Sequence, residues 1–338
     1  MLKKIVKIAL ITLGAIVALL LLALLTIHLV TPLIYTEFFG NAEEAYVTPG
    51  LWDGVVPQGY TYLEEEKVYL MCGYMANGGA SRIYVTPEGD ESESKYVSLI
   101  TKNGEAYTGH TGGITSDGKR VWLANDGDGE DNCVWVLSLD EILGAESGAQ
   151  ITLDIHFKPE SRSAFCLVDG DYLWVGEFRD PEKYLTDESH EFDVADEANN
   201  YALICAYKID GNTETGIASN VPEMLVSVRD LTQGFIRTDD GGFVISTSYG
   251  LSSSVMYTYE NVLDEEADAN LEIDGVSVPV WYLDSDSLTD TVEMPPMSEE
   301  LVYKDGKIYV LFESACHKYI FGNFTRGIHV YSYTAPEN

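Results

Sequence analysis

Five copies of one pattern occur between Leu51 and Tyr333, and this repeat restricts the possible folds more than any other feature. Each copy has a polar cluster, a small residue, an apolar strand, a tight acidic or glycine turn, and an aromatic-rich strand. The turn residues lie 52, 52, 71 and 65 positions apart: Glu66, Gly118, Gly170, Gly241 and Gly306. Such a period suits one antiparallel blade per repeat with variable outer loops. The repeat predicts an all-β domain, a five-bladed β-propeller of four-stranded antiparallel blades.

The last blade requires a strand from elsewhere in the chain. Residues 328–333 are the last clear strand, and they leave the fifth blade one strand short. Residues 45–48 can supply the missing strand from the N-terminal side, which would close the ring and leave no open sheet edge.

Two repeats carry insertions. Residues 179–200 are rich in Asp and Glu and poor in apolar residues, so they predict a long, mobile loop rather than core. Residues 271–278 surround an Asp274-Gly275 pair, which is typical of a hairpin with a type I′ turn. Only residues 138–143 suggest a short helix.

The first 34 residues form a separate segment. Residues 8–27 are 20 residues without a charge, long enough to cross about 30 Å of hydrocarbon as a helix. Lys3, Lys4 and Lys7 precede them, so we expect the N-terminus in the cytoplasm and the remainder outside the cell membrane. No small-residue cleavage motif follows closely, which favours an uncleaved, single-pass anchor over a signal peptide. The predicted divisions are 1–34, cytoplasmic lysines and transmembrane signal anchor; 35–44, linker; and 45–338, β-propeller ectodomain.

The charge of the chain excludes one class of partner. Beyond residue 34 it carries 17 of the 20 Lys and Arg and all 55 Asp and Glu, a formal charge of −38. Nucleic-acid binding requires a basic surface, so it is not expected. The acidic surface indicates solubility, or weak binding of Ca²⁺ outside the cell. The sequence has no H-E-x-x-H, G-x-S-x-G, P-loop or C-x-x-C motif that would identify a reaction.

Short motifs carry a family resemblance. They are Val56-Pro57-Gln58-Gly59, His110-Thr111-Gly112-Gly113-Ile114, Met294-Pro295-Pro296-Met297-Ser298-Glu299 and Leu311-Phe312-Glu313-Ser314-Ala315. In combination they resemble a group of secreted or membrane-anchored bacterial β-propeller proteins. The resemblance covers nearly the whole ectodomain; it implies the fold and says little about chemistry.

Polar residues recur at equivalent positions of the repeats. In a propeller, residues just before the first strand and just after the second strand of each blade converge on one mouth of the central channel. We therefore predict a ligand site there, because convergent polar groups in a concavity mark a binding site. The alternative is that these side chains only cap backbone groups and bind channel water. The predicted ligand-binding residues are Gln58, His110, Arg162, Glu177, Gln233, Ser248, Glu299 and Glu313.

The carboxylates of this set leave several chemistries open. Paired Asp or Glu residues cleave glycosides when suitably spaced, and carboxylates also hold Ca²⁺ or pair with a cationic ligand. A second candidate metal site is the loop with Asp126, Asp128 and Glu130, whose alternating oxygens resemble a Ca²⁺ loop. It lacks the Gly at position six and the Glu at position twelve of an EF-hand, and as a hairpin turn it needs no metal.

The sequence thus predicts a membrane-tethered extracellular propeller that binds a small molecule, glycan or protein partner at the channel mouth, with no catalysis assigned. The alternatives are a glycosidase-like propeller hydrolase that uses the carboxylates at the mouth, and a structural or protein-interaction role.

Overall fold

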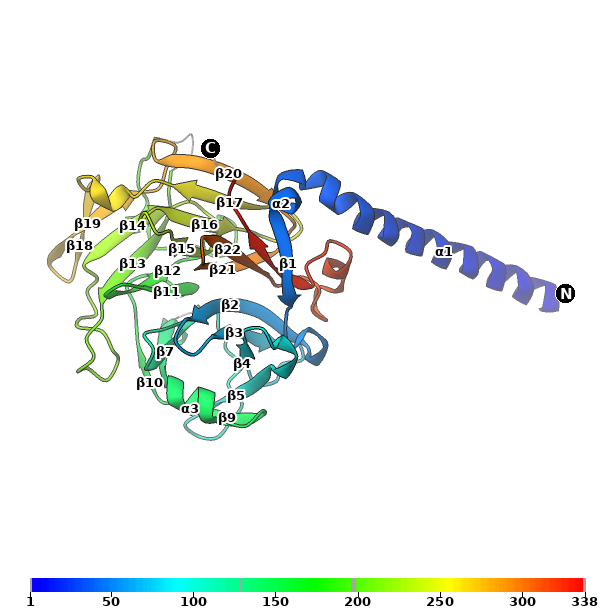
Figure 1. Cartoon of the computed structure of the whole chain (residues 1–338), viewed down its shortest axis with the longest axis horizontal. Helices are drawn as coiled ribbons and strands as arrows, with labels where there is room; N and C mark the ends of the chain where they lie inside the picture. Colours follow the sequence, from blue (N-terminus) through cyan, green and yellow to red (C-terminus); the bar gives the residue numbers. More distant parts are fainter. Residues whose placement is uncertain (1, 128, 196–198, 337–338) are drawn as a thin grey trace.

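The computed structural model describes residues 2–127, 129–195 and 199–336. Five sheets stand around a central axis, which confirms the five-bladed propeller (Figure 1). The innermost strand of each blade packs beside those of the neighbouring blades, so the five strands enclose the channel. These inner strands are β2 (Val55–Leu63), β6 (Gly113–Ser116), β11 (Phe165–Asp169), β15 (Thr232–Arg237) and β21 (Ser298–Lys304).

The blades follow one another in chain order, and each runs outward from its inner strand. Blade 1 continues with β3 (Val68–Met75), β4 (Arg82–Pro87) and β5 (Lys95–Thr101); blade 2 with β7 (Arg120–Asn125), β8 (Cys133–Ser138) and β10 (Ile155–Phe157). Blade 3 continues with β12 (Tyr172–Gly176), β13 (Ala202–Lys208) and β14 (Met224–Val228); blade 4 with β16 (Phe243–Thr247), β17 (Ser254–Tyr259) and β20 (Leu288–Met294).

Blade 5 joins the two ends of the propeller. It contains β21, β22 (Lys307–Phe312) and β23 (His329–Tyr333), and its outer strand is β1 (Ala42–Val47) from the start of the domain. β1 runs antiparallel to β23, with Ala42 opposite Tyr333. This confirms the predicted closure, although the strand begins three residues earlier than expected.

Blades 1 and 3 each gain a strand from an insertion of the blade that follows them. β9 (Ala149–Leu153) follows the predicted short helix, α3 (Leu139–Gly144), and pairs in parallel with β5 of blade 1. The predicted hairpin forms β18 (Ala269–Ile273) and β19 (Val276–Tyr282), with Asp274 and Gly275 at positive φ as its turn requires. β19 adds to β14 of blade 3 although it belongs to the insertion of blade 4.

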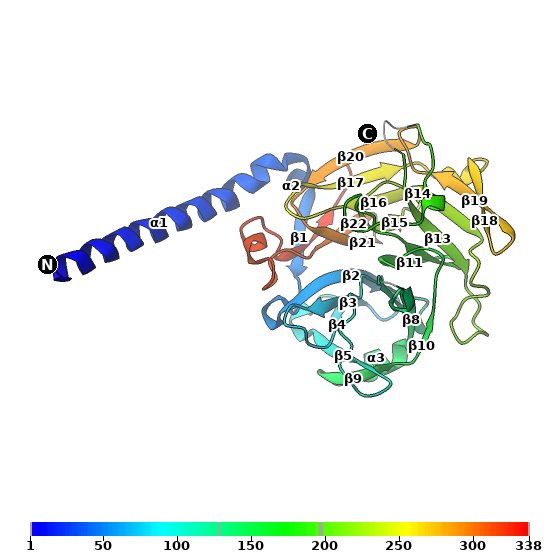
Figure 2. The same cartoon turned by 180° about the vertical axis from the view of Figure 1, so that it is seen from behind.

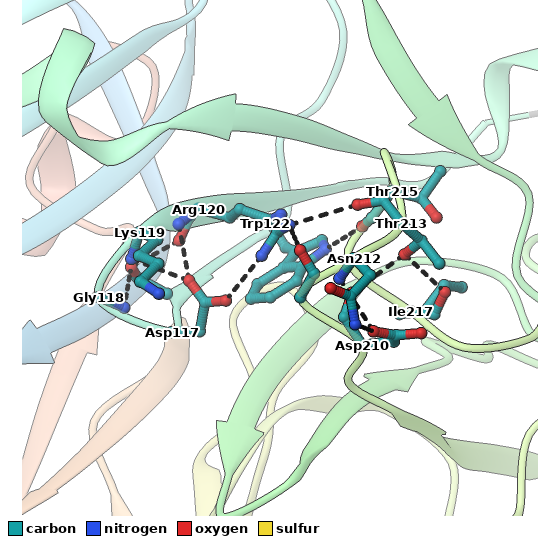
Figure 3. Close-up of polar contacts among 12 residues, drawn as sticks. Asp117, Gly118, Lys119, Arg120, Trp122, Asp210, Asn212, Thr213, Thr215 and Ile217 are labelled. Carbon is teal, nitrogen blue, oxygen red and sulfur yellow. Dashed lines mark hydrogen bonds and ion pairs between the residues drawn. The ribbon is translucent and has the colours of Figure 1, made fainter.

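A polar clasp connects blades 2 and 3 (Figure 3). The Arg120 guanidinium, held by Asp117, donates from Nη2 to the carbonyl oxygen of Gly211 at 2.8 Å. The indole Nε1 of the fully buried Trp122 donates to the carbonyl oxygen of Thr215 at 3.0 Å. The loop after β13 therefore covers an aromatic side chain of the preceding blade.

The N-terminal segment is helical and joins the propeller directly. α1 (Leu2–Ile34) contains one stretch, residues 3–34, that is long and apolar enough to cross a membrane, as a signal sequence would be too. The segment 35–44, predicted as a linker, contains α2 (Thr36–Asn41) and the first residues of β1. Phe38 of α2 is fully buried and packs against Phe312, Tyr331 and Tyr333 of blade 5.

Candidate functional site

A cavity of about 860 Å³ opens at one mouth of the channel. The structure brings seven of the eight predicted ligand-binding residues to its wall, drawn from all five blades. They are Gln58, His110, Arg162, Gln233, Ser248, Glu299 and Glu313. The positions match because each residue begins an inner strand or follows a second strand, and these ends share one face of the ring.

Irregular backbone aims several of these side chains. The pairing of β2 with β3, β15 with β16, and β21 with β22 is interrupted by bulges at Gln58, Gln233 and Glu299 respectively. A bulge turns a side chain away from the regular alternation of a strand. Thr111 and Met297, which precede inner strands, have positive φ values of 49° and 70°, an uncommon conformation for residues other than glycine. The strands are thus distorted at the cavity wall.

Glu299 and Glu313 form the acidic centre of the cavity. Glu299 is 3% exposed, and no hydrogen bond to its carboxyl group is found among the described residues. Burial, and then the charge of Glu313, raise the pKa of Glu299 well above its ordinary range. Burial also raises the pKa of Glu313 to about 7, although Lys318 and a hydrogen bond from Gln58 Nε2 at 3.1 Å oppose the rise. The pair therefore holds a proton near neutral pH.

His110 lines the same cavity as a neutral imidazole. Its ring stacks on Tyr74, with centroids 5.0 Å apart. Enclosure by the cavity walls and the nearby Lys318 ammonium lower the pKa of His110 to about 4, even though the ring faces solvent in the cavity. At neutral pH it can therefore donate one hydrogen bond and accept another.

Aromatic side chains line the cavity on two sides. Phe178 contacts Tyr184 and Tyr249, with ring centroids 5.6 and 5.8 Å apart, and Tyr74 and Tyr319 lie on the other side beneath the Lys318 ammonium. These faces offer apolar surface around a polar floor.

A second cavity of about 700 Å³ adjoins the first and shares His110, Asp126 and Gly127 with it. Trp135 and His156 contribute to its wall, their ring centroids 4.6 Å apart. Together the two cavities extend from the channel mouth over blades 1 and 2.

The loop predicted to hold Ca²⁺ contributes differently to the site. Asp126 pairs with Arg162, with Oδ1 2.7 Å from Nη2, and both residues line the main cavity. Asp128 and the side chain of Glu130 lie outside the described residues. No group of three or more His, Cys, Asp or Glu suited to a metal is found within the described part of the chain. Calcium binding here stays a prediction.

Ser248 and Gln233 have the capping role that the sequence left as an alternative. The buried Ser248 hydroxyl accepts hydrogen bonds from the Met297 N–H and the Ser254 hydroxyl, both at 3.0 Å. Gln233 Nε2 donates to the carbonyl oxygen of Ser248 at 3.2 Å. These contacts fix the junction between blades 4 and 5, which supports Glu299.

Glu177 does not line the cavity, contrary to the prediction. Its carboxylate is 1% exposed and accepts hydrogen bonds from the N–H groups of Arg162 and Leu203 at 3.0 and 2.9 Å. Its other contact is His190 Nδ1, 3.0 Å away, from the acidic insertion. The reason is that Glu177 continues the pairing of β12 with β13 for one residue, which directs its side chain inside the blade.

The insertion 179–200 is anchored where it was predicted to be mobile surface. His190 is 2% exposed, and Asn200 donates from Nδ2 to the carbonyl oxygens of Ser227 and Leu283, each at 3.1 Å. The described part of this loop therefore packs against blade 3 through buried polar contacts.

Glu300 is the residue that sequence reasoning missed. Its carboxylate lies within the ring and accepts hydrogen bonds from the N–H groups of Tyr60 (2.6 Å), Ile114 (3.3 Å) and Cys166 (3.2 Å). These donors belong to blades 1, 2 and 3, so one side chain from blade 5 connects four blades. Burial raises the pKa of Glu300 well above its ordinary range, while the three backbone donors oppose the rise.

Comparisons with known proteins do not assign the chain to a family. No family model and no curated protein matches the chain. Among solved structures it is similar to the PQQ-bound aldose sugar dehydrogenase from Streptomyces coelicolor (13% identity, TM-score 0.42, 80% of this chain and 78% of that one). It is also similar to the exo-β-1,3-galactanase from Phanerochaete chrysosporium (10% identity, TM-score 0.47, 87% of this chain and 64% of that one). At these values the similarities say nothing about chemistry.

Proposed function

We propose that the cavity binds a neutral glycan, and that the propeller is held at the outer surface of a membrane by α1. The proposal rests on the pair Glu299 and Glu313: Glu299 is buried, Glu313 is half-buried, and their carboxyl groups are close enough for their charges to interact in a cavity with aromatic walls. A carboxyl pair that holds a proton both donates to and accepts from hydroxyl groups, and aromatic faces pack against the C–H surface of a sugar ring. Lys183 and Lys318 at the wall offset the acidic centre, which favours a neutral ligand.

The shape of the site favours a chain of sugars over a single small molecule. The main cavity alone falls within the roughly 300–1,000 Å³ typical of small-molecule sites. The adjoining cavity beside Trp135 provides room for further units along the same surface.

Replacing either carboxyl group should weaken glycan binding. We expect Glu299→Gln and Glu313→Gln to raise the Kd by about 10–100-fold, the value of a charge-assisted hydrogen bond. Titration calorimetry of the detergent-purified full chain against a panel of neutral tri- to pentasaccharides measures this. The free energy of unfolding should fall by no more than about 1 kcal/mol, because neither group is core packing.

Glu65→Gln makes the same chemical change in an exposed turn at the opposite end of β2, and it should bind like the unaltered chain. Failure of every oligosaccharide to bind, or equal binding by the two cavity variants and Glu65→Gln, would contradict the proposal.

Hydrolysis of a glycoside is the second candidate, and the pKa of Glu313 near 7 supports it. A general acid must carry its proton at the working pH, and a second carboxylate must lie near it. If Glu313 is this acid, reducing ends should be released from the same panel, with a rate that falls as pH rises through about 7. Glu313→Gln should abolish release while binding remains detectable.

The position of the propeller outside the cell is tested by protease treatment of intact cells. Lys3, Lys4 and Lys7 precede the apolar stretch, so we expect removal of the propeller and retention of a short protected fragment of α1. Digestion only after the cells are lysed would reverse this topology.

A further inference from the structure

Large apolar side chains that are exposed outside α1 gather near the end of that helix. There are seven among the described residues, and Trp52, Leu251 and Ile320 expose 67%, 70% and 60% of their surface. Single exposed apolar residues are ordinary, but a group of them marks a contact surface. Five of the seven belong to the end of β1 and three loops of blades 1, 4 and 5: Val47, Trp52, Tyr249, Leu251 and Ile320.

Contacts place these segments beside the helix. Arg326 Nε donates to the carbonyl oxygen of His28 at 3.4 Å, and the Tyr35 hydroxyl lies 3.2 Å from the Ser253 hydroxyl. The ring of Trp52 contacts that of His317, with centroids 6.3 Å apart. Figures 1 and 2 agree that the loop before β23 lies next to the last turns of α1.

The helix also fixes how the ring stands. α1 leaves the rim of the propeller sideways rather than along the channel axis (Figures 1 and 2). α2 follows α1 after one residue and is held by the buried Phe38, so no flexible linker separates the helix from blade 5. If α1 crosses a bilayer, the ring must stand on its edge above the lipid.

The charges of this edge differ from those of the rest of the ectodomain. Residues 314–336 contain Lys318 and Arg326 and no Asp or Glu, and residues 248–253 and 47–52 contain no charge. A chain with 55 acidic residues has thus none in these three stretches; the acidic residues closest to α1 along the chain are Glu37 in α2 and Glu43 and Glu44 in β1. Such an edge suits a lipid surface, because anionic headgroups repel carboxylates and attract Lys and Arg, while aromatic rings favour the interface.

We propose that residues 47–52, 248–253 and 315–327 form a lipid-contact edge, which lies in the interface of the membrane that α1 crosses. This inference rests on the proposed role of α1 as an anchor and is independent of what the cavity binds. Tyr249, Gly250, Lys318 and Tyr319 belong to these loops and also line the cavity. The cavity therefore opens sideways just above the headgroups, where it meets ligands attached to the same membrane.

Thiol labelling of the full chain in vesicles tests the edge. All five native cysteines are buried, so single variants L251C and I320C accept an environment-sensitive fluorophore selectively. In vesicles of phosphatidylcholine and phosphatidylglycerol with lipids that carry a doxyl quencher near the headgroup, both labels should lose fluorescence. V276C is the matched control, since Val276 is 49% exposed on the hairpin at the opposite side of the ring and should stay unquenched (Figure 1).

L20C within α1, tested with quencher at the acyl chain centre, separates the two proposals. Quenching at 20 together with quenching at 251 and 320 supports the lipid-contact edge. Quenching at 20 with labels at 251 and 320 as bright as the label at 276 would overturn the edge and leave the anchor standing. No quenching at 20 would overturn both.

Discussion

Glu300→Ala is expected to lower the free energy of unfolding by at least about 3 kcal/mol, because it leaves three buried N–H groups without an acceptor at roughly 1–3 kcal/mol each. The donors are the N–H groups of Tyr60, Ile114 and Cys166, which lie in three different blades. The alanine side chain has no oxygen that could accept these hydrogen bonds. Urea unfolding of the full chain in detergent measures the loss. Near-ultraviolet circular dichroism should show loosened aromatic packing.

Two neighbouring variants make this result interpretable. Glu299→Ala removes an equally buried carboxyl from the next residue, but it faces the cavity, so we expect less than about 1 kcal/mol. Glu300→Gln keeps the shape and one accepting oxygen while its NH₂ group opposes one donor, which predicts an intermediate loss. If Glu300→Ala lowers the free energy of unfolding no more than Glu299→Ala does, the Glu300 carboxylate does not hold the ring together.

Glu177→Ala should destabilise the chain by about 3–5 kcal/mol, as expected when one partner of a buried ion pair is removed. The change would leave His190 Nδ1 and the N–H groups of Arg162 and Leu203 without their hydrogen-bond partner. It should leave the seven cavity residues in place, so oligosaccharide affinity measured below the unfolding transition should change little. A loss of affinity without loss of stability would restore Glu177 to the ligand site.

The same pair predicts a pH dependence of defined sign. Burial alone would lower the pKa of His190, but the hydrogen bond and charge of Glu177 outweigh it, and the pKa is raised. The folded state then binds the proton more tightly, so the contribution to stability is full below the ordinary pKa of about 6.5 and is lost as pH rises through the raised value.

Urea unfolding from pH 6 to pH 9 should show this fall in the unaltered chain, and His190→Gln should reduce it. Glu313 adds a fall of the same sign between its ordinary range and about pH 7, so the difference between the two chains isolates His190. His156→Gln, at an exposed histidine, is the control and should follow the unaltered chain. Equal slopes for His190→Gln and the unaltered chain would argue against a titrating pair.

The fold was predictable because a propeller repeats its signals. Four of the five turn residues are glycines that adopt positive φ in the structure, at positions 118, 170, 241 and 306, and each marks the same hairpin of its blade. The ring closure was predictable because the last repeat lacked one strand and the segment before the first repeat contained a strand without a partner. The exchange of β9 and β19 between blades was not predictable, because a strand at an outer edge shows no preference for one neighbour in its own sequence.

Most of the site followed from the same equivalence of positions. Gln58, Gln233 and Glu299 occupy one place in three repeats, and a closed ring brings such places together. The prediction for Glu177 was wrong because its N–H donates to the Leu203 carbonyl oxygen and its carboxylate accepts from the Leu203 N–H, which holds the side chain inside the blade. Nothing local to the sequence signals these contacts.

Glu300 had a signal that went unused. The residue before the apolar strand is small in four repeats, at Gly59, Gly113, Ala164 and Gly234, and a Cβ on Gly113 or Gly234 would lie within 3 Å of backbone atoms of the next blade. The fifth repeat has Glu300 at this crowded place. A charged residue at a position where the other repeats have a small one indicates a side chain that occupies the centre of the ring, as that of Glu300 does.

Blade 5 has a mechanical consequence for a tethered protein. Its outermost strand, β1, follows α1 and α2, so the proposed anchor would pull on this strand, and its innermost strand, β21, carries Glu299 and Glu300. Tension between a ligand held by another surface and the anchor must therefore pass sideways through β21, β22, β23 and β1. A force perpendicular to the strands breaks the hydrogen bonds between neighbouring strands one pair after another. Blade 5 would therefore unfold under such a force before the other four blades do.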